Sequence, residues 1–128
     1  MTFLEKELED FVFEMIKTPS ELIERGLEIY SGYEYFRQLN IDKYGVADIV
    51  GIRKEICHES KKARFYFHVI ELKKQFINYA TLGQACRYLS GLKCATYGSV
   101  GEDYDVDIIQ EIALIGTEID LSTDFIFL

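Results

Sequence analysis

The chain has 128 residues and a mass of 14.9 kDa, and its 48% hydrophobic and 28% charged residues are typical of one soluble globular domain. Eighteen aromatic residues (9 Tyr and 9 Phe) argue against disorder, and the sequence predicts no transmembrane helix and no secretory signal. The net charge of −8 counts against generic binding to nucleic acid, because affinity for phosphates rests largely on Lys and Arg.

The first elements of the chain are predicted to be helices. From Leu4 onward the apolar residues have the spacing of one helical face, and Thr2 with Glu5 three positions later has the pattern of a capping box. A second capping signal at 18–21, with proline at the first helical position, predicts a short helix that ends at Gly26.

Three strands rich in aromatic or β-branched residues are predicted next, at 32–39, 46–52 and 64–73. The polar stretch 53–62 predicts a long loop that joins the last two strands as an antiparallel hairpin. If the pairing is centred on this loop, Asp48 lies near Glu71 on the neighbouring strand.

The remainder is predicted to contain a helix at 77–92 and strands at 108–116 and 125–128. Two helices, three strands, a helix and further strand in this order predict a mixed α/β layer structure over the single domain 1–128. The three cysteines form no Cys-x-x-Cys pair, so buried or idle thiols in a reducing, cytoplasmic compartment are expected.

Charged residues interrupt the predicted central strands. Asp48, Glu71 and Lys73 lie among Val, Ile and Phe, and buried charges are costly unless they are paired or bind a metal. Glu71 and Lys73 are two positions apart, so they lie on the same face. Two carboxylates and a lysine suit phosphodiester hydrolysis with a divalent cation, because Mg²⁺ prefers hard oxygen ligands. The alternative is an internal ion pair of the lysine, and spacing alone favours neither.

The first helix places a carboxylate toward the sheet. At 100° per residue from Leu8, Glu5 lies at about +60°, between Val12 at about +40° and Ile16 at about +80°. Glu9, at about +100°, is expected at the margin of this face. Glu5 therefore either reaches the site on the sheet or serves only as part of the capping box.

Four parts of the sequence carry a family resemblance, and they are Leu4–Phe11, Phe36–Leu39 followed by Tyr44–Val50, Val69–Lys74 and Leu82–Leu89. In this order they resemble four parts of the PD-(D/E)XK nucleases: the opening helix, the strand pair that ends in the first catalytic aspartate, the (D/E)-x-K strand and the Gln-x-x-x-Tyr helix. The NucS-like and Holliday-junction-resolvase-like branches are particularly similar. The resemblance covers about 2–93 and implies a restriction-endonuclease-like αβββαβ core, with a mixed central sheet flanked by helices. Ala47 stands where the family name has proline.

The resemblance implies a DNA endonuclease that depends on Mg²⁺ or Mn²⁺. Asp48 and Glu71 would bind the metal together with the backbone carbonyl of Leu72. Lys73 would assist the attacking water, and Glu5 would reach the site through water. The rival classes are a catalytically silent nuclease fold that acts as a binding or regulatory subunit, and a structural α/β domain in which Lys73 is an ion-pair partner.

The resemblance also implies residues that contact the substrate. Gln84 would orient a phosphate or a water, and the residues implied to bind substrate are Arg37, Lys74 and Tyr88. Helical spacing places Gln84 and Tyr88 opposite to Leu82 and Leu89, so at least one of the pair is expected off the core, with a polar surface pair as the alternative.

The acidic surplus lies at the C-terminal end of the chain. All 14 Lys and Arg lie within 1–100 beside 14 acids, whereas the last 28 residues have no Lys or Arg and eight acids: Glu102, Asp103, Asp105, Asp107, Glu111, Glu118, Asp120 and Asp124. The basic cluster Arg53, Lys54, Lys61, Lys62 and Arg64 either flanks a DNA groove or is a solvated hairpin tip. Weak DNA binding is therefore expected, strengthened by a divalent metal and by a homodimer or a partner with a basic surface.

Two histidines are weaker candidates for chemistry. Cys57 and His58 are neighbours in a polar loop without a second such pair, so a zinc site is not expected. His68 alternates with Phe67 and Val69, and this pattern predicts a hydrogen-bonded strand histidine.

Overall fold

The computed structural model describes residues 3–17, 32–73, 76–116 and 118–119. The elements in chain order are α1 (Phe3–Ile16), β1 (Glu34–Asn40), the 3-10 turn η1 (Asp42–Tyr44), β2 (Val46–Cys57), β3 (Lys62–Leu72), β4 (Phe76–Ile77), α3 (Tyr79–Ser99), β5 (Asp105–Ile115) and β6 (Glu118–Ile119). The helix expected at 18–26 and the strand expected at 125–128 lie outside the described residues.

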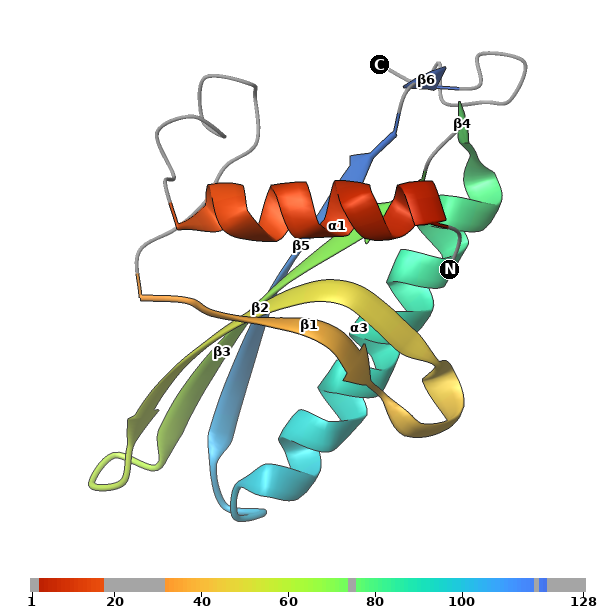
Figure 1. The fold of residues 1–128 in the computed structure, drawn as a ribbon. Coiled ribbons are helices and arrows are strands. Elements are labelled where there is room, and N and C mark those ends of the chain that lie inside the picture. Colours follow the sequence, from red (N-terminus) through yellow and green to blue (C-terminus); the bar gives the residue numbers. More distant parts are fainter. Residues whose placement is uncertain (1–2, 18–31, 74–75, 117, 120–128) are drawn as a thin grey trace.

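Four strands form a mixed sheet in the order β1-β2-β3-β5 (Figure 1). The pairs β1–β2 and β2–β3 are antiparallel, whereas β5 runs parallel to β3 after the crossover through α3. Helix α1 packs on one face of the sheet and α3 on the other. The predicted α/β class, with helices that flank a mixed sheet, is therefore confirmed.

The hairpin of β2 and β3 is antiparallel as predicted, but its loop is much shorter than expected. The strands pair from Ile49 with Ile70 to Cys57 with Lys62, so the turn spans only 58–61. The polar residues of 53–57 belong to the strand because neighbours satisfy them. Arg53 pairs with Glu55 at 2.9 Å and lies over the ring of Tyr66 at 5.2 Å. Such contacts stabilise a strand whose face reaches solvent.

The larger core lies between the sheet and α3. Its buried members include Val50, Val69, Phe65, Phe67, Ala85, Leu89 and Leu92. Helix α3 begins after Asn78, whose side chain accepts a hydrogen bond from the amide of Thr81 at 3.2 Å as half of a capping box. The helix continues to Ser99, seven residues beyond the predicted end, because Gly91 is a packing position and not a C-terminal cap.

Gly91 is expected to tolerate no side chain. A Cβ at this position would lie 2.6 Å from Cδ2 of Tyr44, where α3 packs against the η1 turn. We expect Gly91→Ala to lower the free energy of unfolding by about 1–3 kcal/mol through overpacking, although alanine is the better helix former. A Cβ at Gly83 would have no neighbour within 4 Å, so Gly83→Ala should raise the free energy of unfolding by about 0.5–1 kcal/mol. Urea unfolding of both variants measures the difference, and equal shifts would contradict this packing.

The structure tests what the sequence predicts for the cysteines and for His68. Cys57, Cys86 and Cys94 are free and exposed, so of the two alternatives, buried or idle thiols, the structure excludes burial. His68 is buried, and its Nδ1 lies 3.2 Å from the hydroxyl of Tyr35, so a hydrogen-bonded strand histidine is confirmed. Within the described ranges, no helix has both the length and the apolar character needed to cross a bilayer.

Candidate active site

Asp48 and Glu71 face one another where β2 and β3 stop pairing. Ile49 and Ile70 are the last residues that pair, and Asp48 and Glu71 are the next residues on the two strands, close together as the sequence predicts. The amide of Asp48 donates to Oε1 of Glu71 at 3.2 Å, and the amide of Leu72 donates to Oδ2 of Asp48 at 3.0 Å. Each carboxylate therefore accepts a hydrogen bond from the backbone of the opposite strand, which fixes its position.

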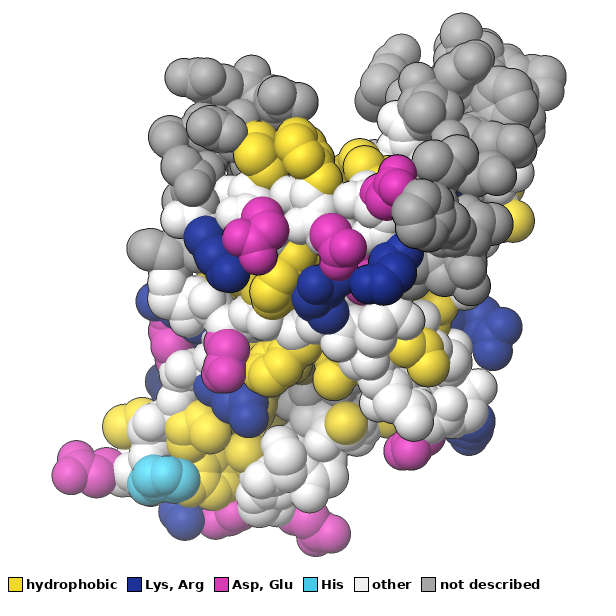
Figure 2. Space-filling model, viewed as in Figure 1, with side chains coloured by type: hydrophobic (Ala, Val, Ile, Leu, Met, Phe, Trp, Pro, Cys, Tyr) yellow, Lys and Arg dark blue, Asp and Glu magenta, His cyan; other side chains and the backbone are white. Residues whose placement is uncertain are grey.

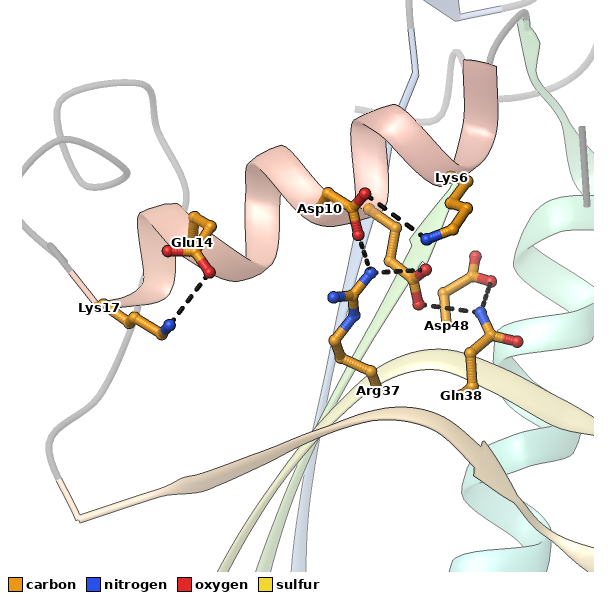
Figure 3. A network of polar contacts seen from close by, with 8 residues as sticks. Lys6, Asp10, Glu14, Lys17, Arg37, Gln38 and Asp48 are labelled. Carbon is orange, nitrogen blue, oxygen red and sulfur yellow. Dashed lines mark hydrogen bonds and ion pairs between the residues drawn. The ribbon is translucent and has the colours of Figure 1, made fainter. Parts of the chain in front are cut away.

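Gln38 extends this arrangement to β1. The residues on either side of it pair with Ile49 and Ala47, so Gln38 lies opposite Asp48 in the ladder. Its Nε2 lies 3.4 Å from Oδ1 of Asp48 and 2.9 Å from Oε1 of Glu9 (Figure 3). Gln38, Asp48 and Glu71 thus form a row across three neighbouring strands, which we call the polar row.

Glu9 is the side chain of α1 that reaches the polar row. It is only 2% exposed, and both of its oxygens are bonded, one to Gln38 and the other to Arg37 at 3.1 Å. Arg37 also pairs with Asp10 and lies over the ring of Phe13 at 5.2 Å. The guanidinium of Arg37 therefore joins β1 to α1. The contact with substrate that the sequence suggests for Arg37 stays a prediction. Buried charge is tolerated here because each carboxylate oxygen has a donor.

The expectation that Glu9 lies at the margin of the sheet-facing arc of α1 is wrong. The arc is rotated, because Phe13, at about +140° from Leu8, packs on the core. Phe11, at about −60°, is 49% exposed instead. Glu9 then lies inside the buried arc. Glu5 lies in α1, but its side chain is outside the described part of the structure.

Lys73 lies directly after the last residue of β3, two positions beyond Glu71. Its amide donates to the carbonyl of Ile115 at 2.8 Å, and its half-buried side chain attracts Asp48 electrostatically, which favours a lower pKa of that carboxyl. Among the described residues, Lys73 forms no ion pair with Asp48 or Glu71. The internal ion pair that the sequence left open is therefore not formed. Lys74 lies outside the described residues.

Helix α3 contributes Tyr88 and Gln84. The ring of Tyr88 is 1% exposed and packs in the same core as Leu89, whereas Gln84 is exposed. The expectation that at least one of the pair lies off the core is therefore confirmed, although helical spacing placed Tyr88 on the wrong face. Only the hydroxyl is polar, and it accepts from Nε2 of Gln84 at 2.6 Å. Burial raises the pKa of Tyr88, and the charge of Glu71 raises it further. The hydroxyl is thus within electrostatic range of Glu71, and it holds the amide of the exposed Gln84.

The site concentrates negative charge in a partly buried place. Burial raises the pKa of Asp48, as does the charge of Glu9, while the bond from the Leu72 amide opposes this increase. Carboxylates that are near one another and partly desolvated resist full ionisation unless a cation joins them. The electrostatics of the polar row thus favour a cation as its ligand.

The raised pKa of Asp48 gives a prediction for stability against pH. A carboxyl whose pKa is higher in the folded than in the unfolded state stabilises the fold when protonated, and this contribution is lost as pH rises through the folded pKa. We expect Asp48→Asn to remove this decrease in stability with pH, because the Asn side chain does not ionise. Its oxygen can still accept the hydrogen bond from the amide of Leu72. The difference in unfolding free energy between variant and unmodified chain should grow from acidic toward neutral pH in the absence of divalent cations. Urea titrations at several pH values measure it, and a constant difference would contradict the raised pKa.

The chemistry of the oxygen donors fits Mg²⁺ or Mn²⁺. Asp48 and Glu71 supply two carboxylates, and the carbonyl of Leu72 follows on the same strand. In the part of the chain that the structure describes, no three His, Cys, Asp or Glu side chains are arranged as a metal cage. Mg²⁺ does not need one, because it keeps several waters and takes one or two carboxylates together with substrate phosphates.

The acidic segment 102–107 lies at the far end of the sheet. Asp103 pairs with Lys61 at 3.6 Å, and Asp107 pairs with Arg64 at 3.5 Å, beside the turn of the β2–β3 hairpin. Along β3 this turn is about 30 Å from Glu71, at 3.3 Å per residue. The acids therefore neutralise part of the basic cluster and do not cover the polar row. This placement favours the solvated hairpin tip over a DNA groove.

Neutralising the acidic segment is expected to leave the polar row unchanged. In the variant with Glu102→Gln, Asp103→Asn, Asp105→Asn and Asp107→Asn, the broken ion pairs are exposed, so each should cost at most about 1 kcal/mol. Affinity for Mn²⁺ should not change, and affinity for DNA should rise only slightly. Calorimetry and fluorescence anisotropy measure the two affinities. Markedly tighter DNA binding would show that this segment acts on the site after all.

Comparisons with known proteins identify no relative of this chain. No family model matches the sequence, and searches among curated proteins and solved structures find no significant similarity. The fold and the polar row define an α/β protein with buried acids and a lysine where three strands meet. A functional conclusion must rest on what these groups can do chemically.

Proposed function

We propose that the chain is a DNA endonuclease that depends on a divalent cation and has a restriction-endonuclease-like αβββαβ core. The observation that carries the proposal is the pair of facing carboxylates, Asp48 and Glu71, with Lys73 directly after β3 and in electrostatic contact with Asp48. The order of elements supports it, since α1, three antiparallel strands, α3 and the parallel β5 follow one another as such a core requires.

Each group of the site has a role in this proposal. A bound Mg²⁺ or Mn²⁺ would offset the phosphate charge and make a water a stronger nucleophile. Asp48, Glu71 and the carbonyl of Leu72 would hold the cation, and backbone amides already orient both carboxylates. The amino group of Lys73 orients the attacking water or offsets the charge that develops on the phosphate. Gln84, fixed by Tyr88, presents its amide to a phosphate oxygen.

The charge distribution supports weak intrinsic binding to DNA. The net charge is −8, and three residues of the basic cluster already have acidic partners: Arg53, Lys61 and Arg64. Few phosphate contacts give low affinity and a shallow dependence on salt, because each contact adds roughly −0.9 to the log–log slope. We therefore propose that the divalent cation, together with a homodimer or a basic protein partner, supplies the missing affinity.

A silent nuclease fold is the second candidate. The observation that favours it is that Oδ2 of Asp48 and Oε1 of Glu71 already accept backbone hydrogen bonds. A purely structural role would need no more than these bonds. The two candidates differ in whether the polar row binds a cation and turns over a phosphodiester.

Cleavage of labelled DNA tests the proposal. Single-stranded, duplex, flap and junction substrates are incubated with the chain and Mg²⁺, Mn²⁺ or EDTA. We expect cleavage of at least one substrate with either cation and none with EDTA. Cation binding without cleavage of any substrate would favour the silent fold. The absence of both cleavage and divalent binding, even with DNA present, would overturn the metal-dependent nuclease.

A further inference from the structure

Gln38 has a backbone conformation that side chains rarely adopt. Its φ is +48°, in the left-handed region, although the residues on both sides of it keep their pairs with β2. Glycine is the usual residue in this region, because a Cβ makes it unfavourable. A non-glycine residue held there within a strand is strained, and such strain persists where the surrounding structure imposes it, often at functional sites.

The side chain of Gln38 explains why glycine is not used. Its amide nitrogen has two hydrogens, and the nitrogen lies 2.9 Å from Oε1 of Glu9 and 3.4 Å from Oδ1 of Asp48. The amide thus stands between a buried acid of α1 and an acid of β2 (Figure 3). The bond to Glu9 is of normal length, whereas the bond to Asp48 is long and weak.

An amide suits this place better than a charged donor. A lysine or arginine between the two acids would form a charge-assisted bond with Asp48 and compete with a metal ion for its oxygen. Arg37 does this for Glu9, whose second oxygen it holds at 3.1 Å. A neutral amide orients Asp48 yet yields Oδ1 to a stronger ligand at low cost. Gln38 can then keep its bond to Glu9 while Asp48 changes partner.

We propose that Gln38 is a positioning residue, whose amide anchors on Glu9 and orients Oδ1 of Asp48 for a divalent cation. This inference rests on the proposed function and adds to it a residue that the strained backbone of β1 brings to the polar row. It also gives α1 a part in the site, because the anchor for the amide is the buried carboxylate of that helix.

The test compares Gln38→Gly with the unmodified chain. Glycine accepts the left-handed backbone and lacks the amide, so the variant removes the contact and the strain together. Asp42→Gly is the matched control, because Asp42 also has a positive φ, of +45°, but lies in the η1 turn outside the polar row. Calorimetry with Mn²⁺ alone gives the dissociation constant, scanning calorimetry without metal gives the melting temperature, and kcat and KM are measured on a cleaved DNA strand.

For Gln38→Gly we expect an Mn²⁺ dissociation constant at least fivefold higher. The melting temperature without metal should change little, because the relieved backbone strain offsets the lost donor to the buried Glu9. KM for DNA at saturating Mn²⁺ should change little. Asp42→Gly should not alter Mn²⁺ binding. If Gln38→Gly binds Mn²⁺ as the unmodified chain does, or loses affinity only because it melts earlier, the positioning role is overturned while the proposed function stands. If the unmodified chain binds no Mn²⁺ even with DNA, the proposed function itself fails, and the positioning role fails with it.

Discussion

Replacing Lys73 by alanine is expected to slow metal-dependent cleavage by about 10²–10³-fold, the usual effect of losing one group that stabilises charge in the transition state. Affinity for Mn²⁺ should be nearly unchanged, because the carboxylates that would hold the cation are fixed by backbone amides and not by the lysine. The free energy of unfolding should change by less than about 1 kcal/mol, since within the described residues Lys73 makes no ion pair.

The same variant separates the catalytic from the structural account. A lysine that neutralised a buried carboxylate would cost about 3–5 kcal/mol when removed, because the acid would be left without a partner. Lys43→Ala, in the exposed η1 turn, is the matched control for loss of one positive charge. Cleavage rates and urea unfolding are measured on both variants. Normal cleavage by Lys73→Ala, together with much earlier unfolding, would favour the structural account.

Mg²⁺ or Mn²⁺ is expected to raise the melting temperature of the unmodified chain and not that of Asp48→Asn. Glu9, Asp48 and Glu71 place negative charge close together, and a bound cation removes their repulsion. At a cation concentration of 100 times the dissociation constant, the gain should be about 2.7 kcal/mol. The Asn variant keeps the hydrogen bond from Leu72 but lacks the charge, so its fold should survive without responding to the metal.

Asp42→Asn is the control for this melting experiment, because it removes an exposed acid outside the polar row. It should gain as much from the cation as the unmodified chain does. Scanning calorimetry with and without millimolar metal measures the gain in each protein. An equal gain in Asp48→Asn would place the cation elsewhere on the chain.

The facing of Asp48 and Glu71 could be predicted from the sequence for a clear physical reason. Charges inside apolar strands are costly, and a two-residue period fixes which of them share a face. The centre of the predicted loop 53–62 lies between 57 and 58, whereas the observed turn 58–61 has its centre between 59 and 60. The neighbourhood of the two acids was therefore predicted, but the exact register of the hairpin was not.

The remaining parts of the site depend on geometry that no pattern of residue types encodes. The rotation of α1 that buries Glu9 depends on how Phe13 packs on the sheet. The position of Gln38 depends on one backbone angle. Tyr88 combines a core ring with a hydroxyl that accepts from Gln84, and helical spacing alone cannot predict both its burial and this polar contact. The position of the acidic segment depends on ion pairs at the far end of the sheet, which join residues distant in sequence.

The most direct test of the central claim, that the polar row hydrolyses phosphodiesters, is single-turnover cleavage of a labelled DNA strand with Mn²⁺ by the unmodified chain and by Glu71→Gln. The glutamine oxygen can still accept from the amide of Asp48, so the variant should keep its fold. We predict cleavage by the unmodified chain and a rate at least about 10²-fold lower for the variant, because the transition state loses a charged ligand of the cation. Equal rates for the two proteins, or no cleavage by the unmodified chain with Mn²⁺ bound, would contradict the claim.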